Sequence, residues 1–293
     1  MKLKRKKRWL AACSLALCLG LLVTGCGGSG GGGGGAPAAG SEQPSESAGG
    51  SQPAEGGANS GGTDSSAAEK VYVVGTDAAY PPFEQVEPDG KITGFDMDVI
   101  QAVADAAGFK IEKKHTGWDG VFDGIDKGTV DIGISTITIT DDRKKKYDFS
   151  DPYFETNQLI LLPEDSTVTK LADLKGKKIG VQSATTGEFV VQEAFGKSYE
   201  GLKGYDDLPG AVDDFFNKRL DAVVADDGVM IYYATKIAGK KYKTLKDDSF
   251  EPEYYGVMVK KGNQELLDKI NQGIKTIKEN GKLEELRKQY FEK

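Results

Sequence analysis

Two stretches of this chain show the same succession of an amphipathic helix, a turn and a strand with an aspartate at its start, as the second residue. The first runs from residues 120–125 (G-V-F-D-G-I) to the apolar strand 130–134 (V-D-I-G-I). The second runs from residues 210–215 (G-A-V-D-D-F) to residues 220–224 (L-D-A-V-V). Strands that alternate with helices form parallel sheets that helices cover on both faces. The sequence therefore predicts an α/β protein with two related halves.

Each predicted half also opens with a strand that leads into a polar loop. Residues 71–74 (V-Y-V-V) precede residues 75–77 (G-T-D), and residues 178–181 (K-I-G-V) precede residues 182–183 (Q-S). In open α/β sheets, ligands bind beyond the carboxyl ends of the strands. Two halves that face each other in this way would form a ligand-binding cleft.

A run of hydroxyl side chains follows the last strand of the first half and ends in an arginine. Residues 135–143 (S-T-I-T-I-T-D-D-R) include Ser135, Thr136 and Thr138 ahead of Arg143. A guanidinium binds a carboxylate through two parallel hydrogen bonds, and hydroxyl and carbonyl oxygens accept from an ammonium group. This set of groups suits a zwitterionic ligand. The alternative interpretation is a threonine-rich strand end followed by a solvated run of basic residues.

The N-terminal segment has the features of a bacterial export signal. Residues 2–8 hold six Lys or Arg, and the apolar run at residues 9–23 is shorter than the roughly 20 residues that span a bilayer. Residues 23–26 (V-T-G-C) resemble a bacterial lipobox. We therefore predict a lipoprotein signal peptide at residues 1–25 and a lipid on Cys26, which would hold the protein at the outer side of the bacterial cell membrane. The alternative is that this cysteine is incidental.

Residues 26–69 are predicted to be the lipidated cysteine and a disordered tether. Residues 27–68 contain no Val, Ile, Leu, Met or aromatic residue, so they cannot bury enough apolar surface to offset the entropy of ordering. A flexible chain of this length reaches on the order of 35–40 Å in r.m.s. terms. Such a tether would let a membrane-held domain leave the surface and return.

Charge and composition exclude several classes of function. The formal net charge is −7, and loss of the six basic residues of the signal would make it −13, so a nucleic-acid partner is not expected. His115 is the only histidine, and no cluster of Cys, His and Asp has the spacing of metal ligands. The glycine run at residues 27–35 lacks the strand and the Lys-Ser/Thr of a phosphate loop. The sequence predicts neither a metal nor a cofactor.

Two further motifs carry a resemblance to a known family. Residues 94–99 (G-F-D-M-D-V) and residues 148–154 (D-F-S-D-P-Y-F) are similar to segments of the family 3 extracellular solute-binding proteins. These proteins are extracytoplasmic receptors that deliver amino acids to ABC importers. The resemblance extends from about Lys70 to the C-terminus, and its motifs occur in the order that the family has.

The resemblance implies a two-lobed α/β fold, the type II periplasmic-binding-protein-like fold, in which two crossing strands join two lobes. Lobe 1 is expected at residues 70–156 plus 253–293, and lobe 2 at residues 157–252. The crossing strands are expected at residues 157–163 and 253–259.

The resemblance also implies how the ends of an amino acid are bound. Arg143 would bind the α-carboxylate, with the backbone N–H of Thr138 beside it. Ser135 and Thr136 would accept from the ammonium group, and Asp226 would bind the same group from lobe 2. A structural alternative for Asp226 is a helix N-cap, because a helical pattern starts directly after it.

Further residues match positions around the ligand in the family. Thr185 and Thr186 open a helix whose free N–H groups would meet the carboxylate. Tyr80 and Trp118 would form the walls of the ligand side-chain pocket. The family usually has glycine where Ala184 stands in this chain.

The predicted ligand is a free L-amino acid, and the residues expected near its side chain indicate which class. Asp77 faces this pocket in the family, and Gln182 occupies a position that varies with specificity. A carboxylate and an amide suit a cationic or an amide group, so the sequence favours a basic amino acid or glutamine. The expected partner is an ABC permease in the membrane.

Paired acids elsewhere in the sequence invite an enzymatic interpretation. Asp96 and Asp98 are expected to be structural, with Asp96 as the cap of a helix and Asp98 in its positively polarised first turn. The alternative functions are a secreted dehydratase-like enzyme on the same fold, with Glu155 or Glu188 as acid or base, or a ligand-sensing surface lipoprotein. No catalytic residue is expected under the receptor hypothesis.

Overall fold

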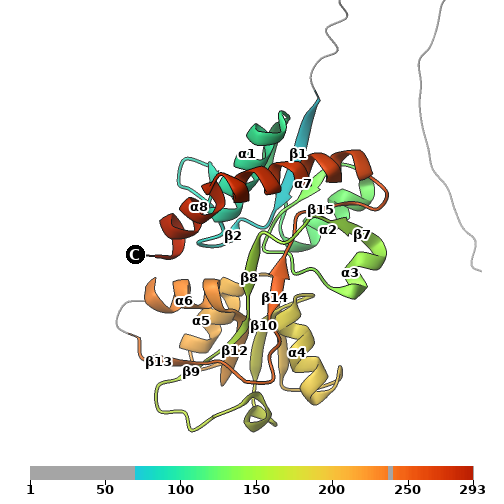
Figure 1. Cartoon of the computed structure of the whole chain (residues 1–293). Coiled ribbons are helices and arrows are strands. Elements are labelled where there is room, and N and C mark those ends of the chain that lie inside the picture. The colour runs from blue at the N-terminus through green and yellow to red at the C-terminus, as the bar shows by residue number, and fades with distance from the viewer. Residues whose placement is uncertain (1–69, 237–239, 293) are drawn as a thin grey trace, which may run out of the picture. The chain divides into compact units, whose positions relative to one another are not determined.

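The computed structural model describes residues 70–236 and 240–292, and Figure 1 shows how the elements of this part of the chain are arranged. The predicted signal peptide, Cys26 and the tether lie outside the described residues. None of the helices in the described part combines the length and the apolar composition that crossing a membrane requires.

The first of two five-stranded sheets lies in the upper part of Figure 1. Three neighbouring strands of this sheet, from one edge to the centre, are parallel. Its strands run in the order β5 (Lys110–His115), β1 (Val71–Thr76), β6 (Ile132–Gly133), β15 (Met258–Lys260) and β7 (Tyr147–Phe149). The strand β1 pairs in parallel with β5 and β6, whereas β15 is antiparallel to β6 and β7. The helices of this part are α1 (Phe95–Ala107), α2 (Trp118–Lys127), α3 (Asp141–Lys146), α7 (Gln264–Glu279) and α8 (Lys282–Phe291).

The second sheet has the same arrangement. Its strands run in the order β11 (Leu202–Tyr205), β10 (Ile179–Gln182), β12 (Ala222–Asp226), β9 (Gln158–Pro163) and β13 (Tyr242–Leu245). The strand β10 pairs in parallel with β11 and β12, and β9 is antiparallel to β12 and β13. The helical segments here are the 3₁₀ turn η1 (Leu171–Leu174), α4 (Thr186–Phe195), α5 (Leu208–Phe216) and α6 (Asp227–Lys236).

The two halves that the sequence indicates are therefore present. The succession β1–α1–β5–α2–β6 in the first half corresponds to β10–α4–β11–α5–β12 in the second, and each gives the same strand order. The prediction of a two-lobed α/β fold is confirmed. The antiparallel strands at one side of each sheet were not predicted, because they come from segments that return from the other half.

Two short strands connect the halves. The strands β8 (Phe154–Thr156) and β14 (Glu253–Tyr255) pair with each other in an antiparallel two-stranded sheet, which Figure 1 shows between the two larger sheets. The expectation that residues 157–163 cross between the halves is wrong. These residues begin with a polar pair but continue as Leu-Ile-Leu-Leu, a buried strand within the second sheet.

A small antiparallel sheet of β2 (Ala79–Tyr80), β3 (Glu84–Val86) and β4 (Ile92–Thr93) leads into helix α1. Gly94 precedes this helix with φ 129°, and a Cβ atom built there would lie 2.2 Å from the carbonyl oxygen of Phe83. Only glycine permits so close an approach. The start of α1 is thereby held against β3, which matters for the site described below.

The parallel strands bring the polar loops of the sequence to facing edges. Asp77 directly follows β1, and Ser135 follows β6 after one further residue, so both lie at the carboxyl edge of the first sheet. Gln182 ends β10 and Asp226 ends β12, at the carboxyl edge of the second. This arrangement is the one in which open α/β sheets bind ligands.

Candidate functional site

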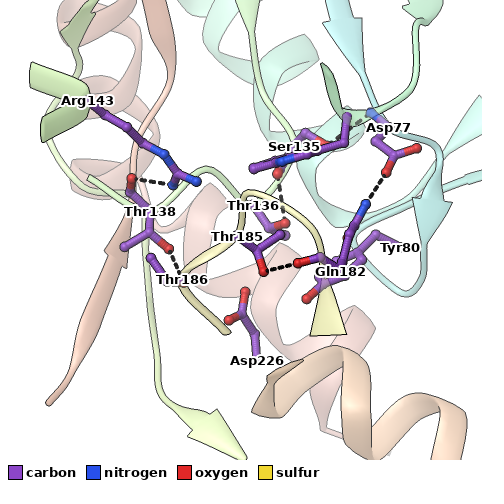
Figure 2. Close-up of a pocket in the computed structure, with 11 residues that line it drawn as sticks. Asp77, Tyr80, Ser135, Thr136, Thr138, Arg143, Gln182, Thr185, Thr186 and Asp226 are labelled. Atoms are coloured by element: carbon purple, nitrogen blue, oxygen red, sulfur yellow. Dashed lines mark hydrogen bonds between the residues drawn. The ribbon is translucent and has the colours of Figure 1, made fainter. Parts of the chain in front are cut away.

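One cavity collects all of the residues that the sequence singles out as ligand-binding. It contains about 310 Å³ of space that protein atoms do not fill, including space that is open to solvent. Both sheets contribute to its wall, as Figure 2 shows. Its lining residues are Asp77, Tyr80, Trp118, Ser135, Thr136, Thr138, Arg143, Gln182, Thr185, Thr186 and Asp226.

Arg143 is held in a defined orientation at one side of the cavity. Thr140 caps helix α3 by accepting a hydrogen bond from the backbone N–H of Arg143 (3.2 Å). The guanidinium donates from Nη1 to the carbonyl oxygen of Thr138 (2.9 Å) and from Nη2 to that of Ala184 (3.2 Å), and it lies 5.3 Å from the ring centre of Trp118. Burial lowers the pKa of Arg143 to about 10, so the group remains charged at neutral pH.

Two threonine hydroxyls beside the arginine bind a common carboxylate. Thr138 belongs to the first half and Thr186 to helix α4 of the second, and each donates from Oγ1 to Oε2 of Glu253 (2.7 Å for both). Glu253 stands on the connecting strand β14. Glu253, which lies on a strand that connects the two halves, thus accepts hydrogen bonds from both of them.

Asp226 lies on the opposite side of the cavity from the first-sheet residues. It accepts hydrogen bonds from the hydroxyl of Tyr255 (2.5 Å) and from the side-chain amide of Gln158. Burial, reinforced by the negative charge of Glu253, raises the pKa of Asp226 to about 7. The side chain is therefore tied to groups of the cavity, and its protonation can change near neutral pH.

Ser135 and Thr136 have their hydroxyl protons committed to acceptors of the protein itself. The hydroxyl of Ser135 accepts from the backbone N–H of Asp77 (3.0 Å) and donates to Oε1 of Glu84 (2.9 Å). The hydroxyl of Thr136 donates to the carbonyl oxygen of Ser135 (2.7 Å). Both hydroxyl oxygens can then only accept further hydrogen bonds, which suits a donor-only group such as ammonium.

The expectation that Asp96 caps helix α1 is wrong. The residue in the N-cap position is Gly94, and no side chain caps this helix. Asp96 lies in the first turn with no solvent exposure, and its Oδ2 accepts from the backbone N–H of Thr136 (2.8 Å) and from the hydroxyl of Tyr153 (2.7 Å). Asp98 is in the first turn, as expected. Close packing of glycine there moves the helix start two residues earlier than the sequence indicates.

Asp77 and Gln182 meet across the cavity. Gln182 donates from Nε2 to Oδ2 of Asp77 (2.9 Å), as Figure 2 shows. Only 5% of Asp77 is exposed, and burial raises its pKa. A buried carboxylate whose partner is a neutral amide can exchange that amide for a cationic group of a ligand.

A second, more open cavity adjoins the first and is rich in acids. It contains about 750 Å³ of unfilled space and shares Asp77 and Trp118 with the first cavity. Asp119, Asp206 and Asp207 also line it. We refer to this cavity as the acidic vestibule. Its charge extends the negative potential of Asp77 towards solvent.

The aromatic residues Tyr80 and Trp118 line the cavity, and Trp118 stands at the start of a helix. It is the first residue of helix α2, where Gly117 adopts φ 71° in the N-cap position. Trp118 and Tyr80 are both buried. Ala184 has φ 59°, a backbone conformation that glycine adopts more easily than alanine. This conformation explains why the family usually has glycine at this position.

Sequence reasoning missed several residues that support the cavity. Glu84, Gln158, Glu253 and Tyr255 bind the lining residues from behind. Gln158 gave a usable signal, since it is a lone polar residue at the head of an apolar strand. Glu84 and Glu253 could not be recognised from the sequence, because the residues that they bind lie far away in the sequence.

The acids considered for an enzymatic function do not line the cavity. Glu155 is exposed on β8. Glu188 accepts from the backbone N–H of Ala184 (2.6 Å) and from the side-chain amide of Gln192 (2.8 Å), so it stabilises the start of helix α4. Within residues 70–236 and 240–292, no three His, Cys, Asp or Glu side chains are grouped as metal ligands.

Comparison with known proteins gives a consistent set of similarities. A profile of the bacterial extracellular solute-binding proteins, family 3, matches residues 72–293. A probable histidine-binding protein of Neisseria gonorrhoeae is 37% identical over 227 residues, which cover 76% of this chain and 84% of that protein.

Solved structures agree with this comparison. The arginine-, lysine-, histidine-binding protein ArtJ of Geobacillus stearothermophilus is 44% identical, with a TM-score of 0.73 over 76% of this chain and 96% of that one. An ancestral arginine-binding protein is 37% identical in two structures. Bound to arginine it gives a TM-score of 0.72 (75% of this chain, 98% of that one), and bound to glutamine 0.71 (76% and 98%).

Proposed function

Because the chain belongs to the bacterial extracellular solute-binding proteins of family 3, we propose that it binds one basic L-amino acid in this cavity and delivers it to an ABC importer. It is a binding protein rather than an enzyme, as its relatives are. Proteins of this family work outside the cytoplasm.

The charge of the cavity lining is the observation that carries the proposal. The lining contains one cationic side chain, Arg143, and two carboxyl groups, those of Asp77 and Asp226. A basic amino acid has one carboxylate and two cationic groups. It would therefore pair every charged group of the lining, whereas a neutral amino acid would leave Asp77 with its amide partner.

The geometry supports a definite orientation of the ligand. Its carboxylate would lie against Arg143 and the first turn of helix α4, where N–H groups have no partner within the helix. Its ammonium would lie between Asp226 and the oxygens of Ser135 and Thr136. The cationic end of its side chain would then approach Asp77 and the acidic vestibule.

These contacts are sufficient for the affinity of a transport receptor. Hydrogen bonds to charged groups contribute about 1.5–3 kcal/mol each, and a micromolar Kd corresponds to about −8 kcal/mol. Pairing of the ligand's carboxylate, ammonium and cationic side-chain group reaches that range. It also offsets the free-energy cost of ordering the surrounding groups. Since both halves supply contacts, the ligand would favour the form in which they are closed around it.

Glutamine is the second candidate ligand. The side-chain amide of Gln182 and the glutamine-bound structure of the ancestral protein support it. Thermal unfolding in the presence of each of the twenty L-amino acids separates the two. A ligand stabilises the protein by RT ln(1 + [L]/Kd), about 2.7 kcal/mol at a hundred times Kd. We expect the largest rise in Tm with arginine, lysine or histidine. A larger rise with glutamine would reassign the ligand, and no rise with any amino acid would contradict the proposal.

Binding should weaken as the pH falls through about 7. The pKa of Asp226 in the ligand-free cavity is about 7, and an ammonium ligand binds only the ionised form, so it would lower that pKa. The contribution of this contact is complete above pH 7 and is lost as protons compete below it. Affinity should fall by up to tenfold per pH unit between about pH 7 and 5.

Calorimetric titration with L-arginine over this pH range measures the effect. Parallel titrations in buffers with different ionisation enthalpies report the proton released on binding near pH 7. Asp226→Asn should bind more weakly and lose most of this pH dependence. An unchanged slope in that variant would assign the effect to another group, such as Asp77.

Two features of the receptor hypothesis concern parts outside the cavity. The closing units would be lobe 1, residues 70–156 with 253–293, and lobe 2, residues 157–252, which β8 and β14 connect. The lipobox-like residues 23–26 support a lipid anchor through Cys26 after removal of residues 1–25. Metabolic labelling with a fatty-acid analogue tests the anchor, since Cys26→Ser should abolish the label.

A further inference from the structure

Two carboxyl groups lie directly behind the residues that would accept the ligand's ammonium. Glu84, the first residue of β3, and Asp96, in the first turn of α1, have no solvent exposure and do not line the cavity. The backbone N–H of Asp96 donates to the carbonyl oxygen of Phe83 (3.0 Å), the residue before Glu84, and the two side chains accept from the consecutive residues Ser135 and Thr136, so the two carboxyl groups are held close together. Oε2 of Glu84 and Oδ1 of Asp96 are buried and have no hydrogen-bond partner among the described residues.

Two facing carboxylates cannot both be ionised in such a place. The titratable groups that act on the pair are Asp77, Tyr153 and Tyr80, and none of them carries a positive charge. Burial raises the pKa of both acids, and their mutual repulsion raises that of Glu84 further. A single proton held between them satisfies both of the oxygens that otherwise lack a partner.

The hydrogen bonds indicate which acid holds the proton. Oδ2 of Asp96 accepts from Thr136 and Tyr153, and two donors favour an ionised carboxylate. Glu84 accepts only from Ser135. Glu84 would therefore be the neutral member and would donate from Oε2 to Oδ1 of Asp96.

We propose that Glu84 and Asp96 form a carboxyl pair sharing one proton, and that this pair positions Ser135 and Thr136 to accept the ammonium group of the ligand. The proposal rests on the amino-acid-binding function given above and adds two positioning residues to it. Neither residue contacts the ligand.

Each acid of the pair controls one of the accepting residues. Thr136 has φ 48°, which is strained for a β-branched residue, and its N–H is held in that conformation by Asp96. Glu84 accepts the hydroxyl proton of Ser135, which turns the oxygen of Ser135 into a pure acceptor. Gly94 holds the two acids in register, since a larger residue would push α1 away from β3.

The experiment compares two substitutions of Glu84 and two probes. The probes are L-arginine and its analogue without the α-amino group, and calorimetry measures both affinities. Glu84→Leu removes the shared proton and the acceptor for Ser135, so we expect at least a tenfold loss for L-arginine. The analogue should lose less than threefold. Glu84→Gln can donate to Asp96 and accept from Ser135, so it should recover most of the lost affinity.

The possible outcomes separate this inference from the proposed function. If the wild-type protein binds none of the amino acids, the proposed function fails. If it binds L-arginine but Glu84→Leu weakens both probes equally, or Glu84→Gln is as weak as Glu84→Leu, the positioning role is wrong. Should Glu84→Leu not fold, infrared spectroscopy decides: well above pH 7, where Asp226 is ionised, the wild type must show a protonated-carboxyl band that Glu84→Gln lacks. Its absence from the wild type overturns the proposal.

Discussion

Replacing Arg143 by alanine should weaken the binding of L-arginine by at least about 2 kcal/mol, which is about thirtyfold in Kd. The ligand carboxylate would then be buried without its cationic partner, and the remaining N–H groups of helix α4 cannot neutralise it. The carbonyl oxygens of Thr138 and Ala184 would also lose the donors that hold them beside the cavity. Isothermal titration calorimetry at pH 7.5 measures the loss.

The neighbouring residue offers a matched control. Lys144→Ala removes the same charge from the same helix, but its side chain is exposed and pairs only with an exposed aspartate, so its affinity should stay within twofold of wild type. Arg143→Lys keeps the charge but lacks the planar pair of donors, and we expect an intermediate loss. Unchanged affinity in a folded Arg143→Ala protein would exclude the role in carboxylate binding.

The second large effect concerns which amino acid is bound. Asp77→Asn should lower the affinity for L-arginine about tenfold and leave that for L-glutamine within threefold. A carboxylate contributes about 1.5–3 kcal/mol to a cationic partner, whereas an amide makes only an ordinary hydrogen bond to either ligand. The amide oxygen introduced by this substitution could still accept from Gln182, so the substitution changes charge more than shape.

A nearby acid tests whether this effect is local. Asp119→Asn removes one charge from the acidic vestibule, but the side chain is exposed and screened by salt, so selectivity should change less than threefold. Competition between the two ligands, measured for wild type and both variants, gives the ratio directly. Equal losses for arginine and glutamine in Asp77→Asn would mean that Asp77 shapes the cavity without recognising a cation.

Much of the fold followed from local patterns in the sequence. The repeated succession of helix, turn and strand predicts two halves, because each helix and each strand needs only its own periodicity to be recognised. No local pattern predicts that β15 and β9 run antiparallel to their neighbours, because each pairs with strands that lie far away in the sequence. The connecting strand β8 was misplaced for the same reason, whereas β14 lies within the predicted residues 253–259.

The candidate site divides in a similar way. Arg143, which ends a run of hydroxyl side chains, could be named from its own chemistry, whereas Asp226, at the end of a strand, was named through the family resemblance. The sequence could not show whether Asp96 caps helix α1, because the start of this helix depends on the contact between Gly94 and the backbone of Phe83. The supporting acids Glu84 and Glu253 act through partners that local sequence does not bring near.

The amino-acid sequence alone determined the class of fold and the residues that gather around one cavity, because these depend on periodicity, on functional groups and on motifs shared with the family. The tertiary structure decided which acids face which donors, and hence which of them stay ionised. Burial and distance control the energy of a charge, and both arise only when separate parts of the chain pack together.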